Sequence, residues 1–101
     1  MKNIVILISG RGSNMQAIVN AAIPNVRIAA VLSNSETAAG LQWAAERGIP
    51  TDSLHHKNFE SRLAFDTAMM EKIDAYQPDL VVLAGFMRIL TLSSVPITKA
   101  G

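Results

Sequence analysis

Apolar runs and helix-like stretches alternate along the chain, and each ends at glycine, proline or a short polar segment. Apolar runs rich in β-branched residues predict strands at residues 3–8, 27–33 and 80–84. We expect a further short strand, the third in chain order, at residues 50–54. The spacing of apolar residues between these runs predicts three helices, at residues 15–22, 37–46 and 61–75. In the third helix, Phe65, Met69, Ile73 and Tyr76 form one apolar stripe. The repeated strand–helix order is typical of a parallel sheet with right-handed crossovers.

Residues at the ends of these elements carry start and stop signals. We expect Thr37 to cap the second helix and Gly48 to end it. We expect the first helix to end near Pro24 and the third to end at Pro78, because proline lacks the backbone N–H that a helix needs. Pro50 indicates that the third strand lies at an edge of the sheet.

The order of the elements predicts an α/β fold: a Rossmann-like open parallel sheet with strand order 3-2-1-4 and helices on both faces. In this order the fourth strand returns beside the first. Ligands of open α/β sheets bind beyond the carboxyl ends of the strands, where the order reverses. We therefore expect residues 10–14 and 85–90 to line one crevice.

The segment after the first strand predicts a site for an anion. It reads Ser-Gly-Arg-Gly-Ser-Asn at residues 9–14, between the strand and the start of a helix. Gly10 and Gly12 permit positive φ and the close approach of a ligand to the backbone. Ser13 or Asn14 can cap the helix, whose N–H groups and dipole favour an anion. An ordinary turn with a helix cap is the alternative interpretation.

The glycine spacing favours a single phosphate over a dinucleotide. A dinucleotide site has a third glycine where this chain has Met15, and a P-loop has a Lys-Ser or Lys-Thr pair, which does not follow Gly12. Ser13 and Asn14 add a hydroxyl and an amide to the backbone donors, a set that suits one terminal phosphate. Near the end of the second strand stands Asn34 rather than an acid, which argues against a truncated nicotinamide-binding domain.

Composition indicates one globular domain and excludes several classes of function. The chain has 101 residues, of which 50% are hydrophobic and 17% charged, with a net charge of +1 and no cysteine. No segment combines clustered Lys or Arg with aromatic residues, so we expect no binding of nucleic acid. No apolar run is long enough to span a membrane. The first apolar run is too short for a signal peptide. The lack of cysteine fits a cytoplasmic protein.

Other polar residues point less clearly to a function. His55 and His56 are adjacent in a predicted loop, with no cysteine or carboxylate at ligand spacing, so we expect them to be exposed and expect no metal. Arg62 and Asp66 are one helical turn apart, the spacing of a surface ion pair. We expect Trp43 to be half covered on its helix.

Two segments together resemble a known enzyme family. Residues 6–18 (Ile-Leu-Ile-Ser-Gly-Arg-Gly-Ser-Asn-Met-Gln-Ala-Ile) and 81–90 (Val-Val-Leu-Ala-Gly-Phe-Met-Arg-Ile-Leu) are similar to phosphoribosylglycinamide formyltransferase. That family transfers a formyl group from 10-formyltetrahydrofolate to the amine of glycinamide ribonucleotide in purine biosynthesis. The resemblance implies that the substrate phosphate binds Gly12, Ser13 and Asn14. It also implies that these residues contact the folate: Arg62, Met87, Arg88, Ile89 and Leu90.

The resemblance ends before the family's catalytic residues. Family members continue with an Asn, a His and an Asp that stabilise the oxyanion and move protons, whereas residues 92–101 contain none of these. We therefore expect residues 1–91 to be the N-terminal half of a formyltransferase domain, truncated relative to the family fold, with a divergent tail at 92–101. No catalytic residue is then present in this chain.

Truncation leads to two further expectations. The isolated chain is inactive unless a C-terminal half complements it, and residues 81–84 form an exposed strand edge through which it self-associates. A non-catalytic, phosphate-ligand-binding module of Rossmann type is the alternative function.

Overall fold

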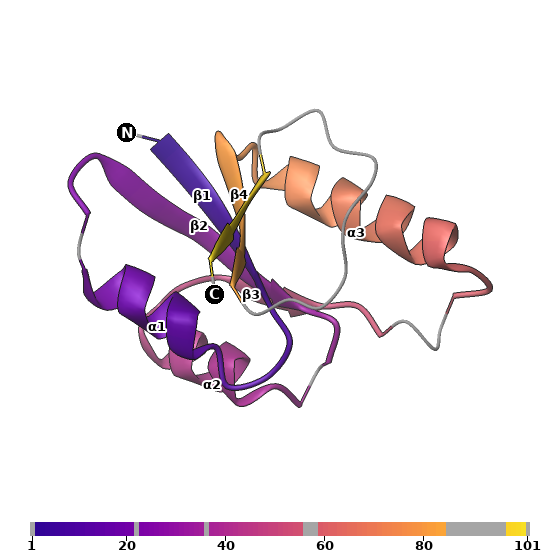
Figure 1. Cartoon of the computed structure of the whole chain (residues 1–101), viewed down its shortest axis with the longest axis horizontal. Coiled ribbons are helices and arrows are strands. Elements are labelled where there is room, and N and C mark those ends of the chain that lie inside the picture. Colours follow the sequence, from indigo (N-terminus) through magenta and orange to yellow (C-terminus); the bar gives the residue numbers. More distant parts are fainter. Residues whose placement is uncertain (1, 22, 36, 56–58, 85–96, 101) are drawn as a thin grey trace.

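The computed structural model describes residues 2–21, 23–35, 37–55, 59–84 and 97–100 (Figure 1). Its elements are β1 (Lys2–Ile8), α1 (Ser13–Asn20), β2 (Val26–Ser33), α2 (Ala39–Glu46), β3 (Thr51–Ser53), α3 (Arg62–Ala75), β4 (Leu80–Ala84) and β5 (Ile97–Ala100). The strands form one parallel sheet in the order β3-β2-β1-β4-β5. The predicted order 3-2-1-4 is confirmed, and β5 extends it. In these ranges, no helix combines the length and the apolar character of a membrane span.

Side chains of the central strand β1 alternate between two apolar cores, because successive residues of a strand point to opposite faces of the sheet. Val5 and Leu7 pack in the core that contains residues of α3. Ile4, Ile6 and Ile8 pack in the core that contains residues of α1 and α2. The sheet is therefore covered on one face by α1 and α2 and on the other by α3, as predicted (Figure 1).

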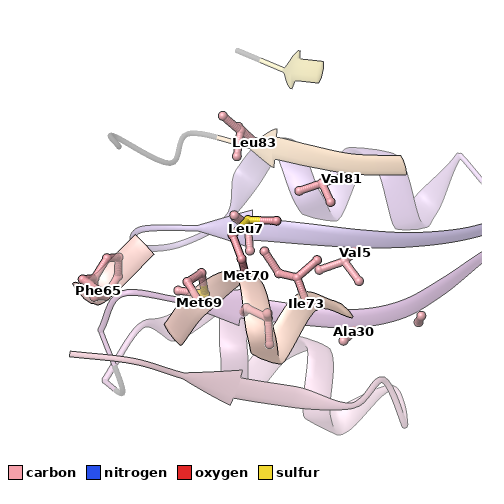
Figure 2. Packing of buried hydrophobic residues seen from close by; sticks show 11 residues of the cluster. Val5, Leu7, Ala30, Phe65, Met69, Met70, Ile73, Val81 and Leu83 are labelled. Atoms are coloured by element: carbon pink, nitrogen blue, oxygen red, sulfur yellow. The ribbon is translucent and has the colours of Figure 1, made fainter. Parts of the chain in front are cut away.

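Helix α3 buries one stripe of apolar side chains against the strands, and Figure 2 shows them directed toward the sheet. Phe65, Met69 and Ile73 are fully buried, and Tyr76 is partly buried against the same core. The predicted stripe is confirmed. The ring of Phe65 also meets the ring of Phe59 edge to face, with centroids 5.7 Å apart, an arrangement that aromatic pairs prefer.

Two polar contacts hold α3 in place. At its start, Ser61 Oγ accepts a hydrogen bond from the backbone N–H of Ala64 at 3.1 Å, which satisfies one donor of the first turn. Near its end, Lys72 Nζ lies 2.7 Å from Asp52 Oδ2 on the edge strand β3. Both side chains of this pair are about one-third exposed, so solvent screening limits its contribution to roughly 1 kcal/mol or less.

Helix α2 ends as predicted but does not begin as predicted. Gly48 follows its last turn with a φ of 75°, the left-handed conformation expected at a helix end. The prediction that Thr37 caps its start is wrong, since the N-cap residue is Ala38 and no side chain caps the helix. The hydroxyl of Thr37 instead hydrogen-bonds to the hydroxyl of Ser35, a local contact that competes with capping.

The edge of β4 is paired with β5. The pairing is parallel and runs from Val81 opposite Ile97 to Ala84 opposite Ala100. The expectation of an exposed edge at residues 81–84 is therefore wrong, because β5 takes up the backbone groups on that side of β4. Among the described residues, the edges of the sheet are β3, the predicted edge strand, and β5.

We predict that Phe65→Ala lowers the free energy of unfolding by about 3 kcal/mol or more, because it leaves a cavity in a fully buried position. Urea denaturation measures the change. Leu63→Ala is the matched control on the same helix. Its side chain is 59% exposed, so the change there should stay below about 0.5 kcal/mol. Similar losses in both variants would contradict the assignment of the buried face of α3.

Candidate functional site

Residues 9–14, here called the β1–α1 turn, connect the central strand to the first helix at the carboxyl end of the sheet. From β1 the chain passes to β2 on one side, while β4 lies on the other side. This reversal of strand order is where open α/β sheets bind ligands. The structure therefore places residues 10–14 at this reversal of strand order, and the crevice itself stays a prediction. Residues 85–90, its predicted second wall, lie outside the described residues.

Carbonyl oxygens of the turn accept hydrogen bonds from the rest of the chain. The oxygen of Gly10 accepts from the N–H of Gly40 at 3.1 Å, and that of Gly12 from the N–H of Gln16 at 2.8 Å. Between them, the oxygen of Arg11 accepts from Gln16 Nε2 at 3.3 Å. The N–H groups at the start of α1 have no acceptor within the helix. With the carbonyls engaged, these donors and the helix dipole determine the electrostatic character of the turn, which favours an anion.

The start of α1 brings the three predicted phosphate-binding residues together. Gly12 is the N-cap residue, with a φ of 69°, and no side chain caps the helix. The prediction that Ser13 or Asn14 is the cap is wrong, because the helix already begins at Ser13 and both residues lie inside its first turn. The Ser13 side chain is exposed and Asn14 is half-buried. The Ser13 hydroxyl is therefore accessible to a ligand.

Packing beneath the turn explains the glycine at position 12. A Cβ added there would lie 2.9 Å from Met15 Cε and 3.3 Å from Ile8 Cδ1. Met15 is fully buried and occupies the position at which dinucleotide-binding turns have their third glycine. Gly10 differs, since it has no positive φ and an added Cβ would meet no atom within 4 Å. Of the two glycines in the turn, only Gly12 is required by conformation and space.

Gly40 is a part of this arrangement that the sequence interpretation missed. It is buried in the first turn of α2, and its N–H is the donor to Gly10. The signal in the sequence is a glycine inside a predicted helix. Glycine weakens a helix, so its presence there indicates that packing leaves no space for a side chain. Only the structure identifies what it packs against.

The residues that the resemblance assigns to folate binding are not brought together by the described structure. Residues 87–90 lie outside the described residues, and Arg62 is the first residue of α3, with only its backbone described. Asp66, the partner of Arg62 in the alternative of a surface ion pair, is only 1% exposed and therefore does not lie at the surface. Asp66 shares the sheet-facing side of α3 with Met69 and Ile73, three and seven residues further along.

The remaining polar residues lie away from the turn. His55 is half-buried rather than exposed, and His56 lies outside the described residues. Within the described ranges no group of three or more His, Cys, Asp or Glu side chains is placed to hold a metal. Trp43 is half-buried as predicted, and the guanidinium of Arg47 lies 3.6 Å from the centre of its ring.

Two surface hollows also lie elsewhere. One of about 480 Å³ lies between α2 and β3, and one of about 540 Å³ lies along α3. Neither is lined by residues 10–14.

Comparison with known proteins bears on this geometry. Residues 2–100 match the family described as formyl transferase. The chain belongs to the formyl transferase family. The match includes the turn at residues 10–14 and extends through β5. The boundary expected at residue 91 stays a prediction.

Individual relatives agree with the family match. The chain is 51% identical over 92 residues to phosphoribosylglycinamide formyltransferase of Escherichia coli (strain K12), which covers 88% of this chain and 43% of the relative. It is 45% identical over 91 residues to the trifunctional purine biosynthetic protein adenosine-3 of Bos taurus, covering 87% of this chain and 9% of the relative.

A solved structure agrees with the fold as well. Glycinamide ribonucleotide transformylase 1 from Symbiobacterium toebii matches with a TM-score of 0.84 and 41% identity, covering 91% of this chain and 45% of that protein. The chain thus spans less than half the length of the Escherichia coli relative and of this solved structure.

We predict that Gly12→Ala lowers the free energy of unfolding by about 1–2 kcal/mol, because a side chain at positive φ is strained and meets Met15. Gly10→Ala is the matched control in the same turn and should change stability by less than about 0.5 kcal/mol. Urea denaturation of the two variants measures the difference. Equal changes would show that the conformation of Gly12 is not what the structure describes.

Proposed function

We propose that this chain is the N-terminal, substrate-binding half of a cytoplasmic phosphoribosylglycinamide formyltransferase. The observation that carries the proposal is the β1–α1 turn, whose carbonyl oxygens at Gly10, Arg11 and Gly12 are bound by the chain's own donors at the positive end of α1. Membership of the formyl transferase family and the similarity to the Escherichia coli relative support the same assignment.

In this proposal the turn binds the 5′-phosphate of glycinamide ribonucleotide through Gly12, Ser13 and Asn14. Backbone N–H groups and the dipole of α1 interact favourably with the negative charge. The exposed hydroxyl of Ser13 adds a further donor. Met15, buried where dinucleotide-binding turns have glycine, favours one terminal phosphate over a bridging pyrophosphate.

The co-substrate, 10-formyltetrahydrofolate, would bind at the other side of the crevice through residues 87–90 and Arg62. The amine of glycinamide ribonucleotide attacks the formyl carbon, and the bond from that carbon to N10 of the folate breaks. The proton that the amine loses balances the proton that N10 gains, so the products are the formylated ribonucleotide and tetrahydrofolate.

This transfer needs groups that the substrate-binding half does not supply. Negative charge develops on the formyl oxygen and needs hydrogen-bond donors, and the proton transfer needs a general acid and base. In the family these are the Asn, His and Asp residues of the segment that follows. The 101 residues by themselves are therefore expected to bind the ribonucleotide without formylating it.

The affinity of the chain for glycinamide ribonucleotide, measured by calorimetry, tests the phosphate site. The same compound without its 5′-phosphate should bind at least about tenfold more weakly, because hydrogen bonds to charged groups contribute roughly 1.5–3 kcal/mol. Ser13→Ala should weaken binding of the ribonucleotide several-fold. Thr67→Ala, which removes an exposed hydroxyl from α3, is the control and should leave the affinity unchanged. Equal affinity for the two compounds would contradict a phosphate site.

Complementation separates a formyltransferase half from a phosphate-binding module without catalysis. The chain alone should show no formyl transfer. Mixing it with the remaining C-terminal segment of the Escherichia coli relative should produce tetrahydrofolate from 10-formyltetrahydrofolate and glycinamide ribonucleotide. Binding of the ribonucleotide with no transfer above that of the added segment alone would favour the non-catalytic module.

A further inference from the structure

Gly40 contacts the β1–α1 turn although most of α1 and all of β2 lie between them along the chain. It lies in the first turn of α2 and is buried. Its backbone N–H donates a hydrogen bond of 3.1 Å to the carbonyl oxygen of Gly10. Helix α2 therefore meets the turn through a backbone hydrogen bond.

Atoms of Ile8 and of the turn fill the space beside Gly40. A Cβ added there would overlap Ile8 Cδ1 and lie 2.9 Å from the carbonyl oxygen of Arg11 and 3.1 Å from that of Gly10. The two oxygens belong to the backbone, so neither can move aside by a change of rotamer. Glycine weakens a helix relative to alanine. The close approach of α2 to the turn accounts for a glycine at this position.

We infer that Gly40 is a positioning residue for phosphate binding at the β1–α1 turn, an inference that rests on the function proposed above. The hydrogen bond to Gly10 and the close approach to Arg11 determine where the backbone of Gly12 and Ser13 lies. Donors to an anion act only within hydrogen-bond distance, and a displacement of about 1 Å can cost roughly 100-fold in function. Gly40 acts through the backbone of the turn.

Ile8 connects Gly40 to the other end of the turn. Its Cδ1 atom lies 3.3 Å from the position of a Cβ at Gly12 and would be overlapped by a Cβ at Gly40. A methyl group at position 40 therefore presses on Ile8 as well as on the carbonyl oxygens. Ile8→Val removes Cδ1 and relieves the overlap with the side chain, but it leaves the contact with the Arg11 oxygen.

The test compares Gly40→Ala with Gly48→Ala in the 101-residue chain. Gly48 lies just beyond the other end of α2, with a φ of 75° and no atom within 4 Å of an added Cβ. Its substitution therefore strains the backbone without reaching the turn. Calorimetry measures the affinity for glycinamide ribonucleotide and for inorganic phosphate, and thermal unfolding measures stability.

We expect Gly40→Ala to weaken binding of glycinamide ribonucleotide about tenfold or more. Gly48→Ala should lower stability but bind both ligands as the unsubstituted chain does. If Gly40 had a merely structural role, Gly40→Ala would likewise lower stability, and its apparent affinity would fall only in proportion to the unfolded fraction. If Gly40→Ala folds and binds as tightly as the unsubstituted chain, the positioning role is overturned.

If Gly40→Ala does not fold, the comparison is made in the presence of Ile8→Val. The double variant should then bind glycinamide ribonucleotide several-fold more weakly than Ile8→Val alone, because the contact with the Arg11 oxygen remains. Equal affinity of these two variants would overturn the inference. Failure of the unsubstituted chain to bind either ligand would overturn the proposed function itself, whereas the outcomes above concern Gly40 alone.

Discussion

The burial of β1 on both faces is the constraint on which the rest of the structure depends. Residues Ile4–Ile8 are all buried, and the strand pairs with β2 on one side and β4 on the other. A one-residue slip of this strand would exchange the side chains of its two faces, which pack in two different cores. The position of its last residue, Ile8, is therefore fixed. The turn that follows is built on Ile8, which lies under both Gly12 and Gly40.

The polarity of the turn arises from contacts between elements as well as from the helix that follows it. A helix N-terminus alone offers N–H groups and a partial positive charge. In this chain, the N–H of Gly40 and Nε2 of Gln16 also occupy the carbonyl oxygens of Gly10 and Arg11. The negative ends of those peptide groups are thereby engaged by the protein. An anion at the turn then meets donors, with less competition from backbone acceptors.

Predictions from the sequence succeeded where a repeating pattern involved many residues and failed where a single side chain decided the result. The stripe of Phe65, Met69 and Ile73 placed α3 correctly, because burial of several apolar side chains outweighs any local preference. Thr37 and Ser13 are good capping residues, yet neither caps a helix. A shift of one or two residues in the helix start removes the geometry that a cap needs. Asp66 has the spacing of a surface ion pair, but it lies on the face of α3 that the sheet covers.

The sequence by itself determined the α/β class, the order of the first four strands, the covering of both faces of the sheet and the position of the turn after β1. Those features follow from hydrophobic periodicity, which is a local property of the chain, and from the right-handedness that crossover connections share in general. Only the tertiary structure decided that β5 pairs with β4, and that the turn is supported by Gly40. Both depend on contacts between segments distant in the chain. The strands β4 and β5 pair through backbone groups. Gly40 approaches the turn closely because it has no side chain. Neither leaves a repeating pattern in the sequence.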